Sequence, residues 1–293
     1  MALGAAVLCA AAQVQTPPAT PPASGQAAEK PVEPPAERPI LQNHGRPMAL
    51  EYRCNEEEIR STGLSCTRED PCPLYLELTS VEAAGNRIFL VGNIHSPSTT
   101  LSSVLLASDD GGKTWREPHE RLRAAGLDHI QFIDFQNGWI SGALLHPLPH
   151  DPFLLTTSDG GQLWRVQAIF AEPRFGFIQQ FWFSSRTNGS IVMDQGQAGE
   201  SGRYELYETP NAGDTWVLRQ TSERPLQIKR ASGTTDWRLR ADAATKSYRI
   251  ERHAADAWHG IASFAVSIGG CTPPEPPAVP SEANAPGISG SGR

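Results

Sequence analysis

Residues 108–115 read SDDGGKTW, and the same pattern returns as TSDGGQLW at residues 157–164 and as TPNAGDTW at residues 209–216. The three octapeptides align without gaps as S/T-x-D/N-x-G-x-T/L-W, and their tryptophans are 49 and 52 residues apart. A motif that recurs at a period of this order is typical of a chain built from repeated supersecondary units. The octapeptides therefore indicate a repeat architecture.

Strand-like runs precede the octapeptides in a constant order. A first and a second run lie at 74–81 and 85–93 in one unit, at 129–135 and 137–145 in the next, and at 176–183 and 188–194 in the third. A third apolar run stands directly before each octapeptide. Each unit is thus predicted to form four short antiparallel strands separated by Gly, Asn or Asp turns. Such a four-stranded unit is one blade of a β-propeller.

A fourth unit is degenerate. Its runs lie at 226–232, 235–241 and 247–253, and Trp258 stands where its octapeptide would end. The sequence therefore predicts an all-β propeller of about four recognisable blades. Residues 261–268 would supply an extra strand that closes the ring.

The predicted blades span 74–118, 128–168, 176–220 and 226–262. Radial packing buries sheet faces that a lone blade would expose. A flat β-sandwich is the alternative, and the regular spacing of a whole four-strand unit favours the propeller.

The residue types of the octapeptide fit a turn between the third and fourth strands. A carboxylate or amide at the third position can accept backbone N–H groups. The following glycine permits positive φ, and the tryptophan packs the turn against the sheet. The threonine hydroxyl can tie the strand back, a bond that Leu163 lacks. We interpret as structural, and not catalytic, Ser108, Asp110, Gly112, Thr114, Trp115, Thr157, Asp159, Gly161, Trp164, Thr209, Asn211, Gly213, Thr215 and Trp216.

The two ends of the chain differ in composition from the middle. Residues 1–12 are small or apolar and predict a signal peptide, truncated at its start because no Lys or Arg precedes the apolar run. Residues 13–47 predict a proline-rich linker and 272–293 a disordered tail. Between them we expect a cysteine-containing segment (48–73) and the propeller (74–271). The predicted signal peptide leads us to expect an exported protein, periplasmic or extracellular. No apolar run reaches the ~18 residues of a membrane span, so we expect no transmembrane segment.

Four cysteines lie at the edges of the predicted folded region, namely Cys54, Cys66, Cys72 and Cys271. In an oxidising compartment this even number suits two disulfides, for which three pairings are possible. One of them would tie Cys271 to the 54–72 segment and clamp the chain ends together. A zinc site is the alternative, but the spacing has no C-x-x-C pair. Cys9 as a lipoprotein anchor is disfavoured by the preceding leucine.

Charge is unevenly distributed along the chain. The formal net charge of −7 argues against a general nucleic-acid binder. Acidic groups gather at 51–70 and basic groups at 224–252. Such asymmetry is usually a solvated face, and a polar surface for a partner is the alternative.

The octapeptides resemble the Asp-box (BNR) repeat of β-propeller proteins, which include sialidases and sortilin-type receptors. NGWISG (137–142) followed by TTSDGGQLW (156–164) is most similar to the photosystem II stability and assembly factor family. The resemblance covers about residues 74–262. It implies a non-catalytic lumenal or periplasmic scaffold of seven blades, but the folded part of this chain is too short for seven.

The more distant resemblance to sialidases implies a hydrolase with three arginines, a Tyr–Glu pair and an Asp acid/base. The first arginine of that family stands in an F/Y-R-I-P motif before the Asp boxes. The nearest match here, Tyr248-Arg249-Ile250-Glu251, follows the boxes and lacks the proline. No G-x-S-x-G, H-E-x-x-H, Walker or dinucleotide motif is present. We therefore expect no catalytic residue, no metal and no cofactor.

Recognition is expected on the face opposite the octapeptides, where the connections between second and third strands and between successive units lie. The candidate residues are His95, Arg121, Arg123, His146, His150, Arg174, Arg219 and Arg224. For the histidines of HPLPHD (146–151), a metal site is the alternative interpretation. For the arginines, a contact surface for an acidic partner is the alternative. The sequence thus predicts a non-catalytic scaffold for a protein or glycan partner. A sialidase-like glycoside hydrolase and a purely structural envelope protein are the alternatives.

Overall fold

The computed structural model describes residues 40–196, 202–229 and 236–273. The predicted signal peptide, most of the predicted linker and nearly all of the predicted tail lie outside these residues. Within the described part, no helix is long and apolar enough to cross a membrane.

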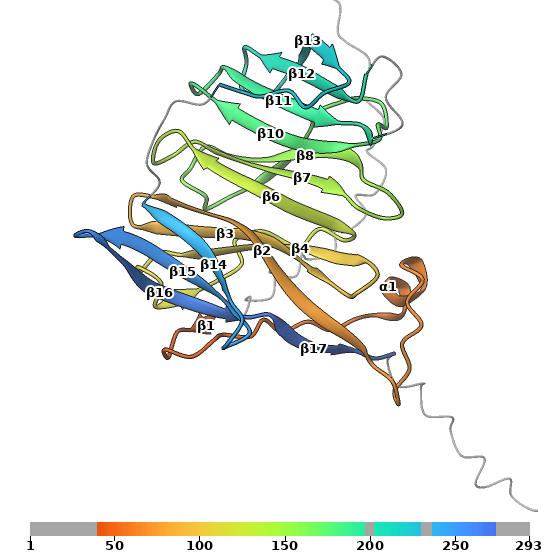
Figure 1. The fold of residues 1–293 in the computed structure, drawn as a ribbon, viewed down its shortest axis with the longest axis vertical. Coiled ribbons are helices and arrows are strands. Elements are labelled where there is room, and N and C mark those ends of the chain that lie inside the picture. The colour runs from red at the N-terminus through yellow and green to blue at the C-terminus, as the bar shows by residue number, and fades with distance from the viewer. Residues whose placement is uncertain (1–39, 197–201, 230–235, 274–293) are drawn as a thin grey trace, which may run out of the picture. The chain divides into compact units, whose positions relative to one another are not determined.

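Four antiparallel sheets of three or four strands dominate the described chain (Figure 1). The first has the order β17-β2-β3-β4, with bounds β17 (Ser267–Cys271), β2 (Cys72–Ala84), β3 (Arg87–His95) and β4 (Thr100–Ser108). The second runs β6 (Ala125–Phe132), β7 (Gly138–Leu144), β8 (His150–Thr157) and β9 (Arg165–Ala168). The third runs β10 (Phe177–Phe183), β11 (Gly189–Asp194), β12 (Tyr204–Thr209) and β13 (Val217–Ser222). The fourth has β14 (Trp237–Asp242), β15 (Ser247–Ala254) and β16 (Ala257–Ala265). The fold is therefore all-β, with sheets of the propeller-blade type, as predicted.

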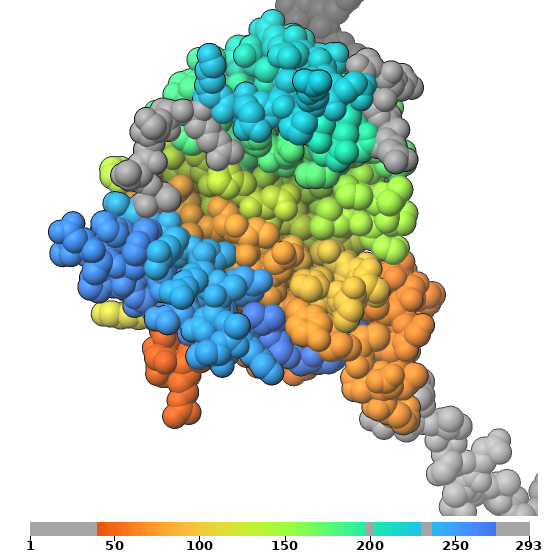
Figure 2. All heavy atoms as spheres, viewed as in Figure 1, coloured from red at the N-terminus to blue at the C-terminus, as the bar shows by residue number. Residues whose placement is uncertain are grey.

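Apolar side chains fill the space between successive sheets. Side chains alternate across a strand, so Ile88 and Leu90 of β3 face the fourth sheet, whereas Phe89 and Val91 face the second. A third cluster, around Phe181 and Phe183, joins the second and third sheets. The packing order is fourth, first, second, third, because β14 lies against β2. Figure 2 shows the blue atoms of the fourth sheet beside the orange atoms of the first.

The second and third octapeptides span the turns β8–β9 and β12–β13, from the third to the fourth strand of their sheets, and the first leads from β4 to β5 (Thr114–Trp115), which pairs with β1 (Leu41–Gln42) in a separate two-stranded sheet. The hydroxyl at the first position accepts the N–H of the glycine at the fifth, as in Gly112 N to Ser108 Oγ at 2.8 Å. The corresponding bonds in the other two turns are both 2.9 Å. This hydroxyl had no assigned role in the turn predicted from the sequence.

The third position of each octapeptide accepts the backbone N–H groups that follow it. Asp110 Oδ1 accepts from the backbone N of Thr114 at 2.9 Å, and Asn211 Oδ1 from that of Thr215 at 3.0 Å. The Thr114 hydroxyl donates to Asp110 Oδ2 at 2.7 Å. Gly112, whose φ is +90°, permits the reversal.

Two of the three octapeptide tryptophans are fully buried. Trp115 and Trp164 are 0 % and 3 % exposed, and Trp216 is only partly buried. Trp115 packs edge-on against Phe264, with ring centroids 5.3 Å apart. Because Phe264 belongs to β16, the first octapeptide also fixes the fourth sheet.

The first strand of each four-stranded blade carries a bulge at the same place. The pairing shifts between Leu78 and Ser80 in β2, between Leu127 and His129 in β6, and between Ile178 and Gln180 in β10. A bulge adds one residue and bends the strand. This recurrence is a property of the repeat that the apolar pattern does not reveal.

The fourth sheet departs from the predicted fourth blade. Residues 226–229 form no strand; instead, the Gln180 side chain bonds the backbone of Leu226 and Ile228. The third strand of the sheet is β16, so Trp258 lies on a strand and does not end an octapeptide turn. The predicted extra strand at 261–268 is divided: residues 261–265 belong to β16, and β17 pairs with β2 in the first sheet.

The boundary predicted for the end of the linker 13–47 lies too far along the chain, because strand structure begins before residue 47. Strand β1 (Leu41–Gln42) pairs with β5 (Thr114–Trp115), the short strand that follows the first octapeptide turn, in a two-stranded sheet. Asn43 then donates its side-chain amide to the carbonyls of Gly112 and Ile261, both at 2.9 Å. Long-range pairing of this kind leaves no local signal in a proline-rich segment.

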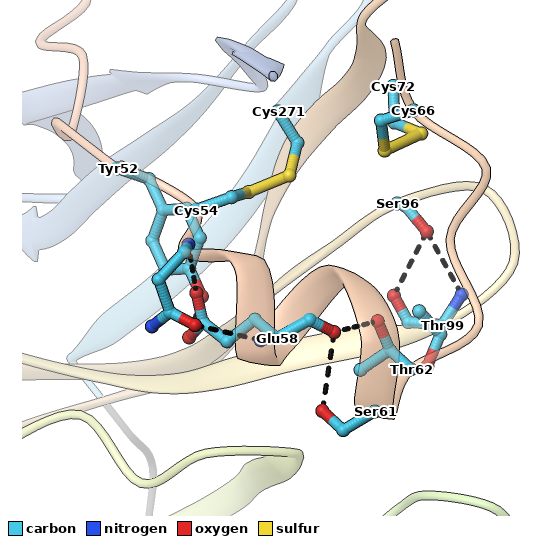
Figure 3. Close-up of a disulfide and its surroundings, with 11 residues drawn as sticks. Tyr52, Cys54, Glu58, Ser61, Thr62, Cys66, Cys72, Ser96, Thr99 and Cys271 are labelled. Carbon is cyan, nitrogen blue, oxygen red and sulfur yellow. Dashed lines mark hydrogen bonds between the residues drawn. A yellow bond between two sulfur atoms is a disulfide. The ribbon is translucent and has the colours of Figure 1, made fainter. Parts of the chain in front are cut away.

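Two disulfides hold the predicted cysteine segment. Cys54 bonds Cys271, and Cys66 bonds Cys72, so these four residues do not form a zinc site. Helix α1 (Glu56–Ser61) starts beside the first disulfide and has a capping box between Asn55 and Glu58 (Figure 3). The segment predicted to clamp the chain ends is thus attached to β17.

Candidate binding face

The face opposite the octapeptide turns, here called the loop face, includes α1 and four connections that the structure describes in full. The connections are 96–99, 145–149, 116–124 and 169–176. Helix α1 joins them because Arg123 donates to Glu57 at 3.1 Å, and Arg121 donates to the carbonyl of Glu51 at 3.0 Å. Part of the predicted face is therefore covered by the N-terminal segment.

The predicted histidines bond neighbouring loop atoms. The Nδ1 atom of His95 lies 2.9 Å from the Ser96 carbonyl, and that of His150 lies 2.7 Å from the Leu148 carbonyl. His146 Nδ1 lies 3.4 Å from the Thr99 hydroxyl. Over the described chain, no group of three His, Cys, Asp or Glu residues is placed to hold a metal.

Most of the predicted arginines are bound to carboxylates. Arg121 contacts Glu117 with both Nε and Nη2, and Arg174 donates to Glu205 at 2.8 Å. Arg224 lies in the connection after β13, where its backbone N donates to Ser222 Oγ. Arg121 and Arg174 are therefore largely engaged within the fold, whereas Arg123 pairs with Glu57 but keeps 62% of its side chain exposed.

Arg219 was placed on the wrong part of the molecule. It lies within β13, not in a connection, and donates to Glu208 at 2.9 Å. Glu208 precedes Thr209, the first residue of the third octapeptide. The error arises because the fourth strand begins directly after Trp216 and continues to Ser222.

An apolar pocket of about 480 Å³ opens on the loop face. Its lining residues are Leu148, Pro149, Phe175, Gly176, Phe177, Asp194, Gln195 and Gly196. Leu148 and Phe175 are 61 % and 56 % exposed, although both are large apolar residues. Neither was singled out from the sequence; an apolar residue between two loop prolines, and two phenylalanines around a glycine, were the available signals.

The two loops that form the apolar pocket are hydrogen-bonded to each other. Gly176 N donates to the Pro149 carbonyl at 2.8 Å, and Asp151 N to the Arg174 carbonyl at 2.7 Å. The Asp151 carboxylate accepts the backbone N–H of Arg174 at 2.9 Å. A second pocket, of about 410 Å³, is lined by Arg174, Phe153 and Phe170. Both pockets therefore adjoin one fixed loop.

A buried Tyr–Glu–Arg cluster stands behind these pockets. Tyr207 donates its hydroxyl to Glu205 Oε2 at 2.5 Å, and Arg174 approaches the same oxygen. Glu205 is only 2 % exposed, and the Arg174 guanidinium lies 4.7 Å from the Phe170 ring centroid. Burial, followed by the bond to Glu205, raises the pKa of Tyr207.

This cluster has one arginine among the described contacts. The Tyr248-Arg249-Ile250-Glu251 stretch lies on β15, in the fourth sheet, where Ile250 is in the core and Arg249 lies near Asp242 and Glu251. The raised pKa keeps the Tyr207 hydroxyl protonated, and this proton is donated to Glu205. The cluster thus has the arrangement of a buried ion pair.

No family model and no curated protein matches the chain. Among solved structures, one described as YCF48 bound to D1 peptide is similar, at 19% identity and a TM-score of 0.33. The match covers 67% of this chain and 60% of that chain, so it spans less than two thirds of the YCF48 structure.

Proposed function

We propose that this protein is a non-catalytic, exported Asp-box propeller that binds a protein partner through the loop face. The observation that carries the proposal is the apolar pocket with Leu148 and Phe175 exposed at its edge. Large exposed apolar side chains around a preformed concavity are typical of interaction sites. The hydrogen bonds between the two loops favour a pocket that is rigid before binding.

A protein partner fits this pocket better than a glycan. Asp194, its acidic lining residue, is bound to Arg203 at 2.9 Å, and the remaining wall is largely apolar. An apolar side chain of a partner would fill such a pocket as an anchor. The disulfides support export, because stable disulfides are typical of oxidising compartments.

Peptide display tests the proposal. The full chain is used to select from a library of random peptides, and enriched peptides are measured by fluorescence anisotropy. We expect peptides with a Leu, Ile, Phe or Met anchor, and a loss of affinity of about tenfold or more in Phe175→Ser and Leu148→Ser. Val217→Ser is the matched control, because Val217 is 46 % exposed on β13. If the selected peptides bind the two pocket variants as tightly as the parent chain, the proposal that this pocket is the binding site is refuted.

A sialidase-like hydrolase is the second candidate, favoured only by the Tyr207–Glu205–Arg174 cluster. The single arginine among the described contacts of the cluster weighs against it, because a sialidase-like site needs three. A panel of fluorogenic glycosides, sialosides included, separates the two functions. We expect no turnover; hydrolysis that disappears in Tyr207→Phe would establish the enzyme instead.

A further inference from the structure

The fourth sheet has one face packed on the core and one open face. Trp237 and Leu239 of β14, together with Ile250 of β15, pack against the first sheet. Because side chains alternate across a strand, the neighbouring residues point to the opposite side, which we call the outer face. It carries Arg238, Arg240 and Asp242 of β14, Arg249, Glu251 and His253 of β15, and Trp258 of β16.

A buried carboxylate organises two arginines on the outer face. Glu251 is only 4 % exposed and accepts from Arg238 Nε at 2.6 Å. The Nε of Arg249 lies 3.8 Å from the other oxygen of Glu251. Arg238 also lies over the Trp258 ring, 4.1 Å from its centroid. These contacts hold the two guanidinium groups before any partner arrives.

Arg240 supplies a positive charge that the sheet does not neutralise. It stands directly opposite Arg249 in the antiparallel pairing of β14 and β15. Like charges in directly opposed positions destabilise a sheet. No carboxylate contacts Arg240 within the described ranges, and Asp242 lies 3.6 Å from Arg249. The outer face thus presents three arginines to two carboxylates.

A hollow of about 480 Å³ continues the outer face beyond Arg249. Its walls include Gly260 and Ser263 of β16 and the first octapeptide turn, from which Lys113 projects as an exposed residue. Lys113 has no ion-pair partner among the described residues. The hollow therefore extends the basic surface from Arg240 and Arg249 toward a fourth cation.

We propose that the outer face binds an acidic segment of a protein partner. Its carboxylates would bridge Arg240 and Arg249, and the segment would continue into the hollow toward Lys113. Arginine is suited to this role because its planar guanidinium pairs with a carboxylate through two hydrogen bonds. The surface is independent of the apolar pocket, which belongs to other sheets.

A protein segment is favoured over a nucleic acid by the charges around the site. The chain has a net charge of −7, which repels a long polyanion. Asp242 also lines the hollow, where it lies 3.6 Å from Arg249, so the area of net positive charge is small. Charge complementarity over such a limited area favours an acidic peptide.

The test uses fluorescently labelled hexaglutamate, with hexaglutamine as the uncharged probe, and anisotropy of the full chain at low salt. We expect hexaglutamate alone to bind, and affinity to fall about threefold to tenfold in Arg240→Gln or Arg249→Gln and further in the double variant. Arg240→Lys should retain part of the affinity, because it keeps the charge but loses the paired hydrogen bonds. Arg219→Gln is the matched control: Arg219 is also an exposed strand arginine with a carboxylate partner.

Four results would overturn this inference. The double variant could bind hexaglutamate like the parent, or the Arg219 control could lose as much affinity. A heparin hexasaccharide or a short oligonucleotide could bind more tightly than hexaglutamate. Light scattering could show a dimer that Arg240→Gln dissociates, which would make a second copy the occupant. Melting temperatures of all variants confirm that each remains folded.

Discussion

At the scale of single residues, the third position of each octapeptide accepts the N–H groups that the turn leaves without a strand partner. The backbone N–H of Thr114, with further turn bonds, holds the pKa of Asp110 at about 2. Asn211 occupies the equivalent position without a charge and accepts the same bond from the backbone of Thr215. The turn thus needs the oxygen, and the charge adds a dependence on pH.

That difference predicts the effect of pH on the first turn. Because the folded pKa of Asp110 is depressed from 3.8, its stabilisation is present above about pH 4 and is lost as pH falls toward 2. We expect Asp110→Ala to lower the Tm by about 2–4 °C at pH 7. Asp110→Asn should cost less, as Asn211 indicates, and should lose less Tm than the parent between pH 4 and pH 2. Identical acid profiles of the Asp110→Asn variant and the parent chain, measured by circular dichroism, would contradict this account.

At the scale of elements, one side chain joins the second and third sheets. Gln131 of β6 donates to the Phe183 carbonyl and accepts the Phe183 N–H, both at 2.8 Å. Gln131 is only 4 % exposed. The Gln131 amide therefore satisfies both the backbone N–H and the carbonyl of Phe183, which lies at the end of β10 just before the β10–β11 hairpin.

Replacing Gln131 should loosen this junction. We expect Gln131→Leu to lower the free energy of unfolding by about 2–4 kcal/mol, because two buried backbone groups lose their partners. Gln167→Leu serves as control: Gln167 makes one exposed bond, to Asp214 at 3.1 Å, and its loss should change stability by less than about 0.5 kcal/mol. Urea denaturation of both variants measures the difference. Equal denaturation midpoints for Gln131→Leu and Gln167→Leu would refute the claim that Gln131 stabilises the contact between the two sheets.

At the scale of the whole described chain, the Cys54–Cys271 disulfide joins residues 217 positions apart, whereas Cys66–Cys72 spans 6. The long bond connects the segment before the first sheet to β17, which pairs with β2. It therefore holds both ends of the described fold against the same sheet.

The two disulfides should differ in their effect on stability. Loop-closure entropy predicts that removing the long one with Cys54→Ser and Cys271→Ser costs about 5 kcal/mol, against about 2 kcal/mol for Cys66→Ser and Cys72→Ser. All four cysteines lie in or beside one apolar cluster. Replacing either pair by serine therefore disturbs the same surroundings, and the two double variants differ mainly in the length of the loop that the disulfide closes. Urea unfolding measures the free energy of unfolding of both variants. A larger loss of stability on removing Cys66–Cys72 would contradict the inference that Cys54–Cys271 clamps the two ends of the described fold.

Some features of the site were accessible from the sequence and others were not. The connections on the loop face were predicted, and the HPLPHD stretch does line it. Leu148 and Phe175 were missed because their exposure depends on bonds between residues 149–151 and 174–176. Arg219 was misplaced because β13 extends to Ser222.

The sequence by itself determined the strand-and-turn repeat, because the octapeptide satisfies its own backbone through hydrogen bonds within eight residues, such as those of Ser108 and Asp110. Tertiary structure alone decided that the fourth sheet packs on the first and that β17 pairs with β2. It also decided which surfaces are hollow or basic. These outcomes depend on contacts between residues far apart in the chain, and no local pattern encodes such contacts.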